Sequence, residues 1–122
     1  MGEEYEALYL DQINWVKVKD KIWEKIIWKD QKSGTYIRLA KTDPGFKGTN
    51  TLKHDCDEFV YVLQGKQINT NNGKVWHQGM SSAFPAGTEH GPFATEEGII
   101  CIEFRYYSKK WINAIQNGKA KS

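Results

Sequence analysis

The chain has 122 residues, of which 39% are hydrophobic and 13% aromatic, so one domain (residues 1–122) can build an adequate core whereas two could not. Its formal net charge of +2 is too small and dispersed to indicate a nucleic-acid partner, and its longest apolar run is too short to cross a membrane. The acidic first residues lack the pattern of a secretory signal, and the two cysteines do not resemble a disulfide framework. We therefore expect a cytoplasmic protein.

Alternation of apolar and polar residues along most of the chain predicts an all-β protein. The predicted strands span residues 21–28, 34–41, 59–63, 67–70, 74–77 and 98–107. Asn71-Asn72-Gly73 lies between two of them and predicts a hairpin turn. We expect N-terminal strands within residues 7–30, a core over about residues 34–107, and a short C-terminal helix over residues 108–117 that begins at Ser108. Many short strands joined by Gly-rich turns predict a β-sandwich or a small barrel.

The strand at residues 59–63 is the most apolar of these segments. An apolar run of this kind predicts a strand that is covered on both faces, and we expect it to stop at Gly65. Because residues two apart in a strand share a face, His54 and Glu58 should lie on the same side as the two valines of this run. Polar groups would then sit at the end of the row, above an apolar floor.

The last predicted strand, residues 98–107, has two faces of different character. Glu103 and Arg105 lie on the opposite face from Ile102 and Phe104, so we expect both charged side chains to point outward or into a subunit interface. The pocket would then hold no general acid or base beyond its ligands, which favours redox or binding chemistry. We expect His77 to be exposed, and the aromatic residues Phe84, Phe93 and Phe104 to belong to the core more than to the pocket.

Two segments carry the spacing of a known pair of motifs. In the first, His54 lies four residues before Glu58, and Glu58 lies seven residues before Gly65. In the second, a short strand and a Pro/Gly turn lead to a histidine, through Gly79, Pro85, Gly87 and His90. With these motifs the chain resembles the cupin superfamily over roughly residues 34–107, which implies a jelly-roll β-barrel. The run after His90, together with the last strand, resembles the subgroup of acetylacetone-cleaving dioxygenases and ChrR-type anti-sigma factors.

The resemblance implies a metal site made by His54, Glu58 and His90. The first histidine of the family's His-x-His pair is replaced by Leu52, so this chain lacks the three-histidine set of the acetylacetone-cleaving relatives. Two imidazoles and one carboxylate with open positions suit non-haem Fe(II), and could also hold Mn, Ni, Co or Zn. A barrel without metal is the alternative. Cys56 is either a replacement ligand or an inert buried thiol.

Three functions stay open on this basis. The first is a metal-binding, dioxygenase-like enzyme that acts on a small carbonyl or phenolic compound. The second is a non-catalytic module that binds or senses a small-molecule ligand, with or without metal, and the third is a metal-free barrel that acts through its surface. Cupins are commonly dimers, so we expect a homodimer. The aromatic N-terminal strands, with Trp15, Trp23 and Trp28, could cover a sheet or exchange between subunits.

Overall fold

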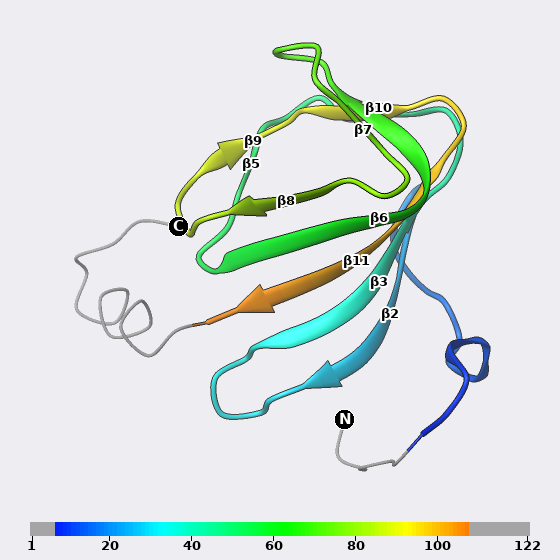
Figure 1. The fold of residues 1–122 in the computed structure, drawn as a ribbon, viewed down its shortest axis with the longest axis vertical. Helices are drawn as coiled ribbons and strands as arrows, with labels where there is room; N and C mark the ends of the chain where they lie inside the picture. Colours follow the sequence, from blue (N-terminus) through cyan, green and yellow to red (C-terminus); the bar gives the residue numbers. More distant parts are fainter. Residues whose placement is uncertain (1–6, 108–122) are drawn as a thin grey trace.

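The structure is a computed structural model that describes residues 7–107, and it consists almost entirely of antiparallel strands (Figure 1). Its elements are η1 (Leu10–Gln12), β1 (Val16–Lys19), β2 (Ile22–Lys29), β3 (Tyr36–Thr42), β4 (Phe46–Lys47), β5 (Leu52–Lys53), β6 (Asp57–Asn69), β7 (Val75–His77), β8 (Ser81–Phe84), β9 (Glu89–His90), β10 (Phe93–Thr95) and β11 (Ile99–Tyr106). The predicted all-β fold is confirmed. The helix expected over residues 108–117 lies outside the described residues. Within residues 7–107, no helix has the length and apolar character that crossing a bilayer requires.

Within this range, nine strands form one curled sheet in which β6 is the central element. The strand order is β1-β2-β3-β11-β6-β10-β4, and both β7 and β8 also pair with β6. The first half of β6 pairs with β11 and β8, and its second half pairs with β10 and β7. The short strands β5 and β9 form a separate pair. Figure 1 shows β2, β3, β11 and β6 as one broad wall, which curls toward β7 and β10.

The strand β6 continues through Gly65, where the sequence led us to expect its end. Gly65 has a φ of +82°, a conformation that other residues rarely adopt. A Cβ atom at this position would collide with the backbone carbonyl of Gly98. Glycine therefore bends the strand and lets β11 approach closely, so that one long strand serves both parts of the curled sheet.

The two faces of β6 differ in burial. Glu58, Val60 and Val62 face inward and are 5%, 8% and 1% exposed. The alternate residues Phe59, Tyr61 and Leu63 are 38–46% exposed, so the expectation that both faces are covered is wrong for the described part of the chain. Sequence hydrophobicity alone did not reveal this, because the outer face of the sheet is itself apolar.

The outer face of β2 and β3 is partly covered by the segment that precedes β1. The indole ring of Trp15 lies 4.8 Å from Lys25 Nζ and 4.5 Å from Lys41 Nζ, in cation–π geometry. Lys25 Nζ also donates a hydrogen bond to the Leu10 carbonyl oxygen at 2.9 Å. These contacts hold the N-terminal segment against the barrel wall and leave the interior open for the site.

Candidate metal centre

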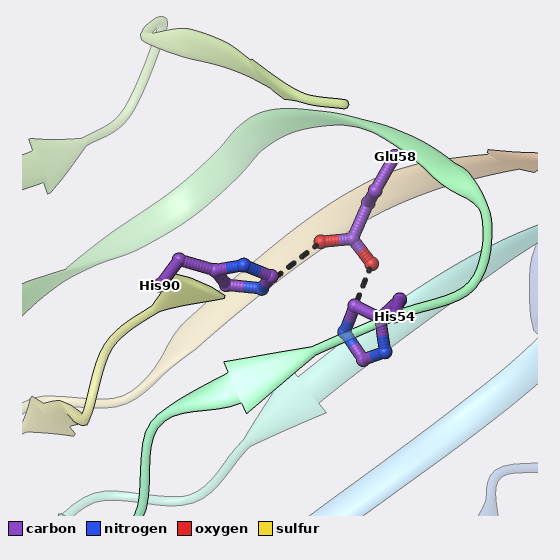
Figure 2. Close-up of side chains that lie close together, drawn as sticks. All are labelled: His54, Glu58 and His90. Carbon is purple, nitrogen blue, oxygen red and sulfur yellow. Dashed lines mark ion pairs between the residues drawn. The ribbon is translucent and has the colours of Figure 1, made fainter. Parts of the chain in front are cut away.

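The turn before β9 joins the two sequence motifs in space. The Gly87 N–H donates a hydrogen bond to the His54 carbonyl oxygen at 2.9 Å, so the second motif is tied directly to the first. Gly87 has a φ of +81°, which glycine adopts without a Cβ penalty. The following strand β9 places His90 opposite Leu52 of β5. His54, Glu58 and His90 consequently face one another, as the motifs predicted (Figure 2).

Glu58 lies between the two imidazoles. His90 Nε2 is 3.8 Å from Glu58 Oε1, and His54 Nε2 is 3.9 Å from Glu58 Oε2. One ligand atom from each residue lies within 4.8 Å of the other two. Such atoms lie about 2 Å from a bound transition metal, so small side-chain rotations would close the three residues on one ion.

Burial sets the charge states of this group. Burial, and then Arg105, lower the pKa of His54 to about 4, and burial also lowers the pKa of His90. Both rings are therefore held in the neutral form that binds metals. Burial and then Glu103 raise the pKa of Glu58 to about 7, although Arg105 opposes that rise.

Two ring nitrogens of the group lack a hydrogen-bond partner among the residues that the structure describes. His54 Nε2 and His90 Nδ1 are buried, and neither makes a hydrogen bond with any described residue. Buried polar atoms in folded proteins are nearly always satisfied, so unpaired nitrogens beside a buried carboxylate need an explanation. A cation bound between the imidazoles and the carboxylate would supply one for His54 Nε2, which lies 3.9 Å from Glu58 Oε2, and the donor set fits a transition metal.

The group lies on the wall of an interior cavity of about 310 Å³. The apolar part of the lining includes Val60, Val62, Trp76, Phe84 and Phe93. Phe84 stacks on the ring of His90, with centroids 4.2 Å apart and an interplanar angle of 20°. Phe84 and Phe93 thus belong to the cavity wall. Phe104, which we expected in the core, is 39% exposed on the outer face.

Glu103 and Arg105 also line this cavity, so the expectation that they point outward is wrong. Alternation along β11 correctly identified which residues share a face, but it could not show which face is inside. The deciding factor is pairing between strands, because β11 places Arg105 beside Glu58 of β6 and Glu103 beside Arg38 of β3. Opposite charges on neighbouring strands compensate one another and permit burial.

We call the five residues Glu24, Arg38, Glu103, Arg105 and Glu58 the charge ladder. Arg38 Nη1 lies 2.7 Å from Glu24 Oε1, and Arg38 Nε lies 2.9 Å from Glu103 Oε1. Arg105 Nη2 lies 3.4 Å from Glu103 Oε1, and Arg105 Nε lies 2.7 Å from Glu58 Oε2. The sequence did carry a signal for the ladder. Arg38 and Arg105 are the only two arginines among the 17 Lys and Arg residues of the sequence, and arginine suits buried ion pairs better than lysine does.

Solved structures share this architecture. A cupin from Shewanella frigidimarina, described as RmlC-like, superimposes with a TM-score of 0.73 and 17% identity, over 90% of this chain and 97% of its own. The protein has the cupin fold. KdgF from Halomonas sp. is a second cupin-fold neighbour, with a TM-score of 0.69 and 22% identity over 88% of this chain and 98% of its own. A chain of the complex between SigE and the anti-sigma factor ChrR from Rhodobacter sphaeroides matches with a TM-score of 0.63 and 19% identity, over 80% of this chain and 52% of the matched one. No protein-family model and no curated protein matches the sequence.

Three further residues can be placed within this cupin fold. Leu52 lines the cavity, so a histidine at its position would face the site. Cys56 is 1% exposed, and burial raises the pKa of its thiol above the ordinary value. Among the described residues, the group that could hold a metal does not include Cys56, which favours an inert thiol. His77 is exposed, as we expected.

Proposed function

We propose that this cupin is a metal-dependent, dioxygenase-like enzyme that acts on a small carbonyl or phenolic compound. His54, Glu58 and His90 would be the metal ligands. The observation that carries the proposal is the convergence of two neutral imidazoles and one carboxylate, within 4.8 Å, on the wall of an interior cavity. Two histidines and one carboxylate with open positions are typical of non-haem iron oxygenases.

A bound ion would polarise a substrate oxygen and, if it is iron, would permit reaction with O2. The apolar walls, including the Phe84 ring against His90, would exclude water from the reacting atoms. The cavity of about 310 Å³ is at the small end of the range for ligand pockets, which favours a small substrate.

Charge along the cavity favours a substrate that binds as its anion, such as an enolate or a phenolate. Among the described residues, four cationic side chains and two carboxylates line the cavity, namely Lys19, Arg38, Lys47, Arg105, Glu58 and Glu103. The arginines are already paired with carboxylates, so the two lysines supply the excess positive charge. A cleft lined by excess charge of one sign raises the local concentration of the opposite ion.

Elemental analysis of the untagged protein, purified without added metal, tests the proposal. We expect a near-stoichiometric transition metal in the wild type, its loss in His90→Ala, and its retention in His77→Ala, which removes an exposed histidine outside the group. Iron or copper would favour redox chemistry, and zinc would favour Lewis-acid chemistry. A wild-type protein that takes up no iron, manganese or nickel would refute the proposal.

Oxygen consumption with 1,3-dicarbonyl and catechol compounds then separates an enzyme from a binding module. Uptake of O2 that depends on His90 supports the enzyme. Metal and ligand binding without turnover of any compound would replace this proposal with a non-catalytic sensing role.

We also propose that the exposed outer face pairs two chains into a homodimer. Phe59, Tyr61, Phe104 and Tyr106 lie on neighbouring strands β6 and β11 and are 38–47% exposed. Contiguous apolar surface of this kind commonly marks a protein–protein interface. Light scattering should give the mass of two chains, and a monomeric mass would exclude the dimer.

A further inference from the structure

Arg105 makes the shortest polar contact to the proposed ligand group. Its Nε lies 2.7 Å from Glu58 Oε2, and its Nη2 lies 3.4 Å from Glu103 Oε1. The side chain of Glu58 is 5% exposed and that of Arg105 is 16% exposed, so the contact is shielded from solvent. A charge-assisted hydrogen bond in such surroundings holds both partners firmly.

The position of Arg105 is fixed from its far side. Glu103 accepts a hydrogen bond from Arg38 Nε at 2.9 Å, and Arg38 in turn donates to Glu24 at 2.7 Å. The sheet pairs Arg38 with Glu103 and Arg105 with Glu58 on adjacent strands, so backbone register places these charges. The guanidinium is therefore held between two carboxylates.

This arrangement makes the two oxygens of Glu58 unequal. Oε2 accepts a hydrogen bond from Arg105 and lies 3.9 Å from His54 Nε2, whereas Oε1 has no contact with Arg105 and lies 3.8 Å from His90 Nε2. A carboxylate held by one oxygen can rotate little about its last bond, and its free oxygen keeps a defined direction. Residues that orient metal ligands in this way tune metal affinity although they do not touch the ion.

We propose that Arg105 is a positioning residue, which holds Glu58 through Oε2 so that Oε1 is presented to the metal as a single-oxygen ligand. The inference rests on the proposed metal site. It concerns how this chain orients the carboxylate of the proposed ligand group, and it gives the Arg105–Glu58 end of the charge ladder a role.

The direction in which metal affinity changes when Arg105 is replaced distinguishes a positioning role from a purely electrostatic one. A guanidinium near a cation repels it, so an Arg105 that acted only as a nearby charge would weaken metal binding. Replacing it by a neutral residue would then strengthen binding. An Arg105 that positions Glu58 predicts the reverse, because its loss frees the carboxylate to turn.

The test is a titration of the metal-stripped 122-residue chain with Co²⁺ at pH 8. Calorimetry measures the affinity, and the visible spectrum reports the coordination of the bound ion. The variants are Arg105→Gln, Arg105→Lys and the matched control Arg38→Gln. The control replaces Arg38, the other arginine of the ladder. Arg38 is also paired with two carboxylates, Glu24 and Glu103, and neither of these is Glu58. Circular dichroism and melting curves verify that each variant is folded.

We expect Arg105→Gln to weaken Co²⁺ binding about 10- to 100-fold and to change the spectrum. Arg105→Lys should fall between this variant and the wild type, because one ammonium cannot match the fork that spans Glu58 and Glu103. Arg38→Gln should weaken Co²⁺ binding less than Arg105→Gln does, because Arg38 contacts Glu103 and acts on Glu58 only through Arg105. If Arg105→Gln is unfolded, the weaker binding expected of Arg105→Lys decides the matter.

Binding by the Arg105 variants that is as tight as in the wild type, or tighter, would overturn the proposal. An equal loss in Arg38→Gln would also overturn it, because the effect would then be general disruption of the cavity wall. A wild-type protein that binds no Co²⁺ is a different result. It removes the metal site itself, and the role of Arg105 falls with it.

Discussion

Replacing Glu58 by glutamine should alter how stability depends on pH in the metal-free protein. Burial and Glu103 raise the pKa of Glu58 from 4.5 to about 7, so the folded state holds a proton that the unfolded chain has already released. The stabilisation from this proton is fully present below pH 4.5 and is lost as pH rises through about 7. At about 1.4 kcal/mol for each pKa unit, the wild type should lose on the order of 2–3 kcal/mol between pH 5 and pH 8.

Glu58→Gln cannot lose this contribution, because glutamine resembles the protonated carboxyl and does not titrate. Urea denaturation of both proteins at pH 5 and pH 8, with a chelator present, gives the free energy of unfolding in each case. The free energy of unfolding of the variant, relative to that of the wild type, should therefore be about 2–3 kcal/mol higher at pH 8 than at pH 5. Burial and Arg105 lower the pKa of His54 in both proteins, so that contribution cancels in the difference. A wild-type-minus-variant difference that is the same at both pH values would refute the elevated pKa of Glu58.

Three further substitutions test the site and the fold. Leu52→His restores an imidazole that faces the cavity opposite His90, and it should tighten Co²⁺ binding at least about tenfold in calorimetry; unchanged binding would mean that this position cannot reach the ion. Val62→Ala removes two methyl groups from a side chain that is 1% exposed, and urea denaturation should show a loss of about 1–3 kcal/mol, where no loss would contradict the packed interior. Gly65→Ala drives a Cβ into the carbonyl of Gly98 at a φ of +82°, so the variant should fail to fold by circular dichroism, and a wild-type spectrum and melting temperature would show that the two strands can separate.

The convergence of His54, Glu58 and His90 could be predicted from the sequence because these residues lie in local patterns. His54 and Glu58 precede the apolar run of β6, and His90 follows a Pro/Gly turn whose spacing is distinctive. Strand periodicity then placed Glu58 correctly on the inner face with the valines. What joins these patterns in space is long-range pairing, of β8 with β6 and of β9 with β5. Hydrogen bonds from Gly87 to the His54 carbonyl and from Ala86 to Asp57 add to it, and no local pattern reveals them.

The charge ladder could not be predicted from local pattern, because its stability is a property of four strands together. Each strand contributes one or two charged residues, and each charge taken alone favours the solvent-facing side. Only the register that places Arg105 beside Glu58 and Arg38 beside Glu103 makes their burial favourable. The outer face of β11 misled us for a related reason. Its apolar side chains resemble a core, although Phe104 is 39% exposed.

The charge ladder also limits how this sequence can change over evolutionary time. Removing one member leaves a buried charge without its partner, which typically costs about 3–5 kcal/mol, whereas replacing a whole ion pair by well-packed apolar residues is often tolerated. A domain whose total stability is about 5–15 kcal/mol tolerates few substitutions that remove a single charge of the ladder. Ladder positions should therefore vary in concert, with Arg38 and Glu103 lost or kept together. Engineering that reshapes the cavity would have to redesign the whole charge ladder together.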